Sequence, residues 1–298
     1  MKPPRRHHFV PIVYLKGFAD PEARGKLEHL WYLRRGASTW VSAALKDVGV
    51  EKDWYLLEKP RMQKQPEAAQ VHELSLEEYS NKFEVRMGLV LPKVRSGRSL
   101  TLEDQRDLAL FVANLLYRTP RMRQMTKMVL PTVARDRLRA RDPGFQEGVL
   151  EDVAAGTYLR PESRNLVKSA PLLVSEHFAL KLLRMDWTLY HRVGGAMFIT
   201  SDTPVAVRQA GRLEPHMHIQ ARNPVVSIPL GSDVALVALQ GTGRRRWAEK
   251  AEPSVVMDVN RRSVDLSSGE VFSRSCEFEG VNDVEILQRS VSGKEAAR

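Results

Sequence analysis

The middle third of this chain carries apolar residues at helical spacing, and both flanking thirds carry short apolar runs broken by turn residues. One helical face is formed by residues three or four apart: Leu76, Tyr79, Phe83, Met87 and Val90. Thr101 with Asp104 is a capping box that predicts the start of a second helix. The pattern predicts an α+β fold, in which a central helical segment packs on a mostly antiparallel sheet built from N- and C-terminal strands.

Turn residues divide the flanking regions into short elements. Residues 30–33 and 40–41 flank a turn signal and predict a hairpin, and a second hairpin is expected around Gly194 and Gly195. Pro120 should kink or end the second helix, a third helix is expected over residues 132–141, and Pro171 should split a helix over 161–183. We predict one domain over residues 1–298: β-rich over 1–66, helical over 67–184, β-rich over 185–280 and a flexible tail over 281–298.

Composition excludes several classes of protein. Cys276 is the one cysteine of the 298 residues, which excludes an internal disulfide and a multi-cysteine metal site. No apolar run approaches the roughly 18 residues of a membrane-spanning helix. The first residues lack the apolar centre of a signal peptide. A cytoplasmic protein is therefore expected.

The net charge of +10 lies in the N-terminal half of the chain. Residues 93–146 hold 12 Lys or Arg against 5 Asp or Glu, whereas residues 147–298 hold 19 of each. A concentrated basic stretch attracts polyanions such as nucleic acid. The residues expected to contact phosphates are Arg121, Arg123, Lys127, Arg135 and Arg139. The alternative is a solvated arginine-rich helix face.

Two adjacent histidines, His7 and His8, precede the apolar Phe9 and Val10. Imidazole is a common metal ligand and titrates near neutral pH. Neighbours in an extended segment point to opposite faces, so one of the two would enter a given site. We take His8 as a candidate catalytic residue and metal ligand and His7 as a binding residue; the alternative is that both lie on the surface.

Polar residues also occur within apolar helical runs. Glu84 borders the apolar stripe of the first helix and is a candidate catalytic carboxylate and metal ligand, or else a solvated flank. Asn114 and Arg118 are four residues apart and therefore share a helix face. A buried arginine needs a carboxylate or an anionic ligand. Arg118 is thus either a catalytic residue, with Asn114 as a binding residue, or half of a structural ion pair to Glu84 or Asp202.

An apolar strand end at Ile199 leads into Ser201 and Asp202, followed by Pro204. Strand ends often present catalytic carboxylates, so Asp202 is a candidate catalytic residue and metal ligand, and Ser201 a candidate binding residue. The alternative is a turn stabilised by the short polar side chains. The phosphate-binding glycine loops, the HExxH helix and the GxSxG turn are absent from the sequence.

Together these features resemble a bacterial family known as domain-of-unknown-function family 4238. The strongest resemblance is the opening at residues 7–19, and the step from Ser201 to Pro204 is the next most specific. The Glu84 helix, the Arg118 step, residues 228–230 and Asn260 also fit, whereas Thr203 stands where the family often has Asn. The resemblance covers roughly residues 7–275. It implies that these clusters converge on one site, and it supplies no activity.

Three functions remain open from the sequence. The first is a hydrolase, a metal-dependent nuclease whose divalent ion is held by His8, Glu84 and Asp202 while Arg118 stabilises negative charge. The second is a non-enzymatic nucleic-acid-binding or defence-associated module. The third is a small-molecule enzyme that binds an anionic ligand through Arg118.

Overall fold

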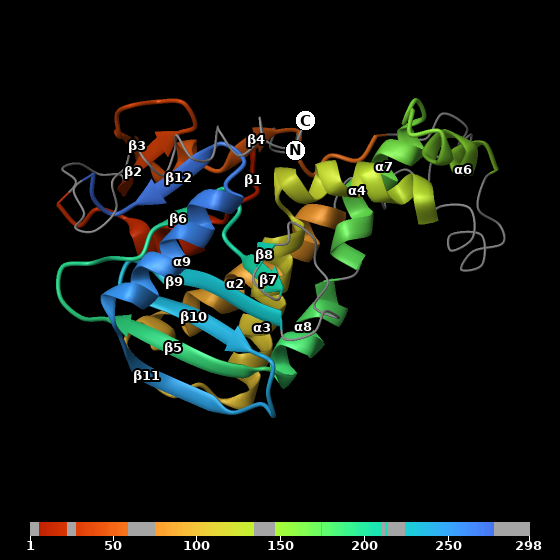
Figure 1. Cartoon of the computed structure of the whole chain (residues 1–298). Helices are drawn as coiled ribbons and strands as arrows, with labels where there is room; N and C mark the ends of the chain where they lie inside the picture. Colours follow the sequence, from red (N-terminus) through yellow and green to blue (C-terminus); the bar gives the residue numbers. More distant parts are fainter. Residues whose placement is uncertain are drawn as a thin grey trace.

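The structure is a computed structural model that describes residues 6–22, 28–58, 75–133, 147–173, 175–209, 212–213 and 224–276. Short N-terminal strands are followed by helices and then by the remaining strands (Figure 1). This order confirms the predicted α+β class. Within the described part of the chain, no helix combines the length and the apolar character needed to cross a membrane.

The N-terminal part contains two small strand pairs. Its elements are β1 (Arg6–His8), α1 (Ile12–Leu15), η1 (Lys16–Phe18), β2 (His29–Arg34), β3 (Val41–Ala44), η2 (Leu45–Asp47) and β4 (Val50–Lys52). Strand β1 pairs with β4, and β2 pairs with β3 in the predicted hairpin, both antiparallel.

The helical part begins at residue 75. Its helices are α2 (Ser75–Arg95), α3 (Leu102–Tyr117), α4 (Pro120–Val133), α6 (Glu147–Ala154), α7 (Pro161–Leu173) and α8 (Ser175–Arg184). The predicted capping box is present, because the side chains of Thr101 and Asp104 each accept the other's backbone N–H at 3.1 Å. Pro120 ends α3 as expected and starts α4, since proline needs no backbone donor in the first turn of a helix.

The C-terminal strands form two sheets. They are β5 (Asp186–Arg192), β6 (Thr200–Ser201), β7 (Ala206–Gln209), β8 (Arg212–Leu213), β9 (Pro224–Gly231), β10 (Val234–Leu239), β11 (Arg245–Ala251) and β12 (Glu270–Ser273), with helix α9 (Pro253–Leu266) before β12. One sheet has the order β11-β5-β10-β9-β7-β8, and the other has the order β3-β2-β12-β6. All described pairings are antiparallel except that of β11 with β5.

The hairpin predicted around Gly194 and Gly195 is wrong. Strand β5 pairs with β10 and β11, whereas β6 pairs with β12 in the other sheet. The two glycines mark a turn, but a turn signal does not determine which strand pairs next. The apolar strand β10 offers a longer match to β5 than the two residues of β6. The expected split of the helix after residue 161 is present, and it falls between Leu173 and Ser175 rather than at Pro171.

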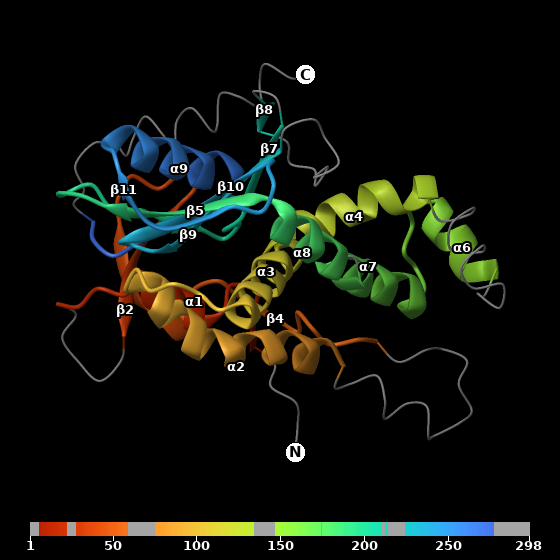
Figure 2. The same ribbon diagram turned by 90° about the horizontal axis from the view of Figure 1, so that it is seen from below.

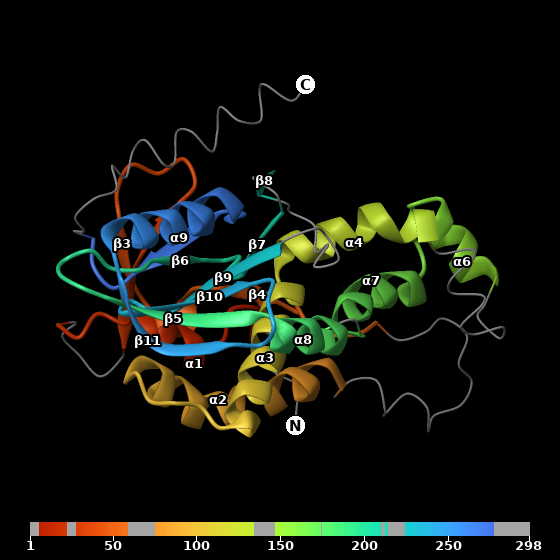
Figure 3. The same cartoon turned by 60° about the horizontal axis from the view of Figure 1, so that its bottom comes forward.

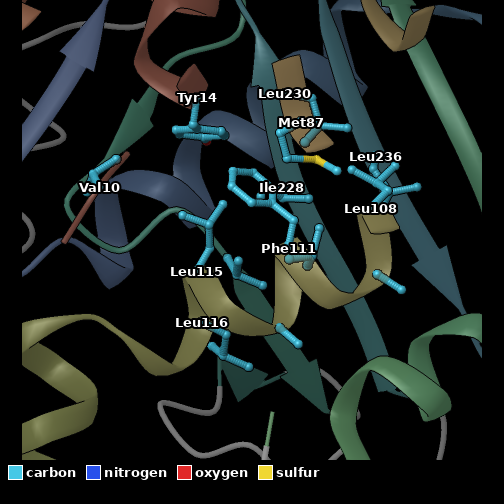
Figure 4. Close-up of a cluster of buried hydrophobic side chains, with 14 of the residues drawn as sticks. Val10, Tyr14, Met87, Leu108, Phe111, Leu115, Leu116, Ile228, Leu230 and Leu236 are labelled. Atoms are coloured by element: carbon cyan, nitrogen blue, oxygen red, sulfur yellow. The ribbon is translucent and has the colours of Figure 1, made fainter. Parts of the chain in front are cut away.

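The six-stranded sheet lies between α9 on one face and α1, α2 and α3 on the other (Figure 2). The main core fills the space between the sheet and helices α1, α2 and α3. There, Phe111 and Leu115 of α3 meet Ile228 and Leu236 of the sheet (Figure 4). Tyr14 is fully buried there; its hydroxyl lies 2.7 Å from Thr200 Oγ1 and donates to the Pro229 carbonyl at 2.7 Å.

Helices α4, α6 and α7 project from the side of this layered body (Figure 3). They share a small apolar cluster of Leu130, Val149, Val153 and Val167 that is separate from the main core. We call these three helices the satellite. Their near ends still reach the main core, through Met122 of α4 and Leu172 of α7.

Candidate functional site

Strand β1 places the two histidines on opposite faces, as expected. His7 is 2 % exposed and packs edge-on against Tyr55, with ring centroids 5.5 Å apart. His8 is partly buried, and its Nε2 atom has no hydrogen-bond partner in the described structure. Burial lowers the pKa of His8, and Arg118 acts in the same direction against the raising effects of Glu84 and nearby backbone groups. The imidazole is therefore held neutral at pH 7.

Arg118 lies at the end of α3 and gathers three elements around its guanidinium. Nη1 donates to Glu84 Oε1 of α2 at 2.8 Å and to Asn114 Oδ1, one turn earlier on α3, at 3.2 Å. Nη2 donates to the backbone carbonyl of His8 in β1. The guanidinium also lies 5.3 Å from the ring centroid of Tyr55. We call His8, Tyr55, Glu84, Asn114 and Arg118 the Arg118 network.

The network neutralises the charge of a buried arginine. The Arg118 side chain is 2 % exposed and that of Glu84 is 25 % exposed. Burial by itself lowers the pKa of Arg118. Tyr55 and Glu84 act in the opposite direction, and the net effect is a raised pKa. The structural ion pair between Arg118 and Glu84 that the sequence left open is thus present. Asn114 Nδ2 and Arg118 Nε are buried and remain without hydrogen-bond partners in the described structure.

Asp202 does not join this network. Its carboxylate accepts hydrogen bonds from Ser268 N at 2.8 Å, Glu270 N at 3.1 Å and Ser267 Oγ at 3.2 Å. Burial raises the pKa of Asp202, against these hydrogen bonds. Ser201 Oγ accepts from Thr203 N at 3.2 Å and can donate to its carbonyl at 3.1 Å. Both polar groups thus close the turn, which is the alternative that the sequence left open.

The proposed metal ligands are not brought together as a set. His8 and Glu84 lie beside Arg118, while the Asp202 carboxylate is taken up by the loop at residues 267–270. Within the described ranges, no three His, Cys, Asp or Glu side chains lie close enough to hold a metal ion. A guanidinium already occupies one oxygen of Glu84 and repels a further cation.

The basic residues predicted to contact phosphates differ in their surroundings. Arg121 is partly buried and its Nη1 donates to the Leu266 carbonyl at 3.0 Å, where it offsets the dipole at the end of α9. Lys127 is exposed on α4. Arg135 and Arg139 lie outside the described residues. The helix predicted over residues 132–141 lies mostly outside the described residues, since the description stops at residue 133. Helix α4 was not predicted, because Pro120 starts a helix as well as ending one.

Sequence reasoning missed a pocket between the main body and the satellite. It is lined by Trp54, Tyr55, Tyr117, Arg118, Thr119, Arg123, Val167, Lys168, Pro171 and Leu172. We call this the cationic pocket. Three segments far apart in the sequence form it, and no spacing pattern joins them.

Among the residues that the structure describes, two of its cations have only backbone oxygens as hydrogen-bond partners. Arg123 Nη2 donates to the Trp54 carbonyl at 2.8 Å, and its guanidinium lies 3.2 Å from the centroid of the Trp54 ring. Lys168 Nζ donates to the Leu56 carbonyl at 2.6 Å. Burial lowers the pKa of Arg123 to about 10, and burial together with the nearby Arg123 charge lowers that of Lys168.

Comparison with known proteins identifies a family and no relative of known activity. A family model described as a protein of unknown function, DUF4238, matches residues 6–277. No curated protein and no solved structure matches the chain.

Proposed function

The chain belongs to the DUF4238 family, whose description assigns no activity, and we propose that it binds a small anionic ligand in the cationic pocket. The observation that carries this proposal is that Arg123 and Lys168 line the pocket without an ion-pair partner in the described structure. Among the described residues, no carboxylate lies within ion-pair distance of either side chain, although both are partly buried and line one pocket. Glu51 acts on Arg123, and Glu58 and Asp53 act on Lys168, only at longer range.

Burial of a cation is unfavourable unless a carboxylate or a ligand offsets its charge. The same fold neutralises Arg118 with Glu84, whereas the partly buried Arg95 donates to the backbone carbonyls of Leu230 and Tyr14. What distinguishes Arg123 and Lys168 is that the two cations line one pocket. Within the described ranges, Arg123 and Lys168 have no carboxylate partner, and each retains further N–H donors for an acceptor. A carboxylate or phosphate group entering the pocket supplies both the negative charge and the acceptor oxygens.

The low exposure of the aromatic lining residues favours a compact anionic group as the ligand. Trp54, Tyr55 and Tyr117 are 4 %, 7 % and 6 % exposed, so they offer little open surface for stacking a nucleobase. A phosphate or carboxylate head group is the part that the pocket would hold. We expect the ligand to be a small metabolite or to present only its charged group.

The two alternatives from the sequence have weaker support. Metal-dependent nuclease action would need ligands beyond His8 and Glu84, because Asp202 is committed to its loop. Docking of a nucleic-acid backbone would need several exposed cations on one face, but Arg121 and Arg123 are partly buried, and Lys127 is the exposed one among the described members of the predicted set. Both alternatives remain proposals, and Arg135 and Arg139 of the basic stretch lie outside the described residues.

A thermal-shift titration tests ligand binding. The full chain is heated with inorganic phosphate, pyrophosphate, a sugar phosphate or a dicarboxylate, each at several concentrations. A ligand that binds the folded state raises the Tm, by an amount that grows with concentration. The shift in Tm should disappear in Lys168→Met and in Arg123→Met. It should persist in Lys127→Met, which removes an exposed charge from α4, the helix that carries Arg123.

Two results would contradict the proposal. One is that no anion in the panel raises the Tm of the wild-type chain. The other is that Lys168→Met and Lys127→Met show the same shift as the wild type.

A further inference from the structure

The cationic pocket lies at the seam between the satellite and the main body. Trp54, Tyr55, Tyr117 and Arg118 form one wall, and Arg123 of α4 with residues 167–172 of α7 forms the other. Because the far end of the satellite has its own apolar cluster, the part of α7 that precedes Leu172 can shift against the main body while Leu172 stays in the main core. The width of the pocket therefore depends on how closely α7 approaches residues 54–58.

A set of polar contacts holds α7 against this segment. Arg164 donates to both carboxylate oxygens of Glu58, at 2.8 and 2.5 Å. Asn165 Oδ1 accepts from Glu58 N at 2.8 Å, and Asn165 Nδ2 donates to the Glu58 carbonyl at 2.7 Å. Lys168 adds its bond to the Leu56 carbonyl. We call the contacts of Glu58 with Arg164 and Asn165 the clasp.

The clasp is the weak side of the seam. The side chains of Arg164 and Glu58 are 36 % and 39 % exposed, so water competes for their charges and the pair stabilises the closed arrangement only modestly. The opposite side is apolar and buried, since Met122 and Leu172 are 3 % and 4 % exposed and belong to the main core. Opening at the clasp with rotation about the apolar side costs less than separation at both sides.

We propose that the clasp is the gate of the cationic pocket: α7 moves away from Glu58 to admit an anion and closes again over it. This inference rests on the proposed function for its ligand. Lys168 contributes a bond to both the empty and the occupied pocket. Its Nζ donates to the Leu56 carbonyl when the pocket is empty and turns to the anion when one enters. Ligand binding and closure are thereby coupled through one side chain.

Hydrogen exchange of a single amide reports the motion without any ligand. The Glu58 N–H is bonded to Asn165 Oδ1, so it exchanges only when the clasp opens. By NMR, it should exchange at least about tenfold faster than the amides of the central strand β10, which open only with the whole fold. Arg164→Gln should speed exchange at Glu58 about threefold, whereas Arg6→Gln, which removes an exposed ion pair to Asp47, should not change it.

A cross-link tests the link to binding. In a Cys276→Ser chain, Glu58→Cys with Asn165→Cys would join the two sides of the clasp by a disulfide. The oxidised protein should take up inorganic phosphate at least about tenfold more slowly than the same protein after reduction, as followed by stopped-flow tryptophan fluorescence.

The two experiments separate the gate from the pocket. If the Glu58 amide exchanges as slowly as strand β10, or if oxidised and reduced proteins bind phosphate at the same rate, the gate is wrong. If the wild-type chain binds no anion while the Glu58 amide exchanges quickly, the seam opens as proposed and the proposed function fails.

Discussion

The Arg118 network and the cationic pocket are adjacent, and their buried cations have different kinds of partner. Arg118 meets a carboxylate, an amide oxygen and a carbonyl, and its side chain is almost fully buried. Arg123, five residues later, meets a carbonyl and an aromatic face, and Lys168 meets a carbonyl. Arg118 thus joins helices α2 and α3 to strand β1, whereas under our proposal Arg123 and Lys168 keep their charge available for a ligand.

The largest effect should come from breaking the network. Arg118→Met leaves the Glu84 carboxylate and the His8 carbonyl without their donor, and we expect a loss of about 3 kcal/mol in the free energy of unfolding. Urea unfolding followed by circular dichroism measures it. Arg6→Met, which removes an exposed pair, should lose less than about 1 kcal/mol. Equal losses in the two variants would mean that the network has no special structural role.

Asp202 should behave as a structural carboxylate rather than a catalytic one. Asp202→Ala removes the acceptor of two backbone N–H groups and one hydroxyl, so we expect a loss of about 1–3 kcal/mol. Anion binding measured below the lowered Tm should be unchanged. If Asp202→Ala keeps full stability but loses binding, then Asp202 belongs to the ligand site and the separation of the two regions fails.

His8 should make the stability of the network depend on pH. Its pKa in the folded state is below the ordinary 6.5, so its contribution is fully present above pH 6.5 and is lost as the pH falls through the folded value. Between about pH 7.5 and about pH 5, the wild-type chain should lose more stability than His8→Gln. The measurement is urea unfolding of both chains at each pH; parallel losses would show that His8 does not titrate within the network.

The smallest change in stability is expected in the pocket. Lys168→Met removes a partly buried cation that has no ion-pair partner among the described residues, so the free energy of unfolding should stay within about 0.5 kcal/mol or rise slightly. The same variant is expected to lose anion binding. If Lys168→Met lowers the free energy of unfolding as much as Arg118→Met does, then Lys168 is a structural residue and the contrast between the two regions is lost.

The sequence predicted the parts of the fold and site that depend on local spacing. The capping box at Thr101, the end of α3, the start of α7, and the shared face of Asn114 and Arg118 all follow from residues within a few positions of each other. The need of a buried arginine for a carboxylate also predicted a partner for Arg118, either Glu84 or Asp202, and the structure has Glu84. Turn-forming polar residues at Asp202 were recognised as the alternative to catalysis.

The rest depends on contacts that no local pattern encodes. The sequence cannot show that Arg118 bonds the carbonyl of His8, because every residue carries a carbonyl. Lys168 reads as an ordinary surface lysine until α7 is placed beside Leu56. Gly194 and Gly195 signal a turn, yet the partner of β5 is decided by the longer apolar strand β10.

The four-stranded sheet has a consequence for synthesis of the chain. Strand β2 (His29–Arg34) lies between β3 and β12 (Glu270–Ser273), so one edge of the first hairpin stays open until more than two hundred further residues have been translated. At about 5–20 residues per second, this interval is roughly 10–50 s. During that time Trp31 and Tyr32 belong to an unpaired edge, which is the arrangement that favours pairing with other chains. A nascent chain of this protein is therefore expected to depend on chaperones until β12 arrives.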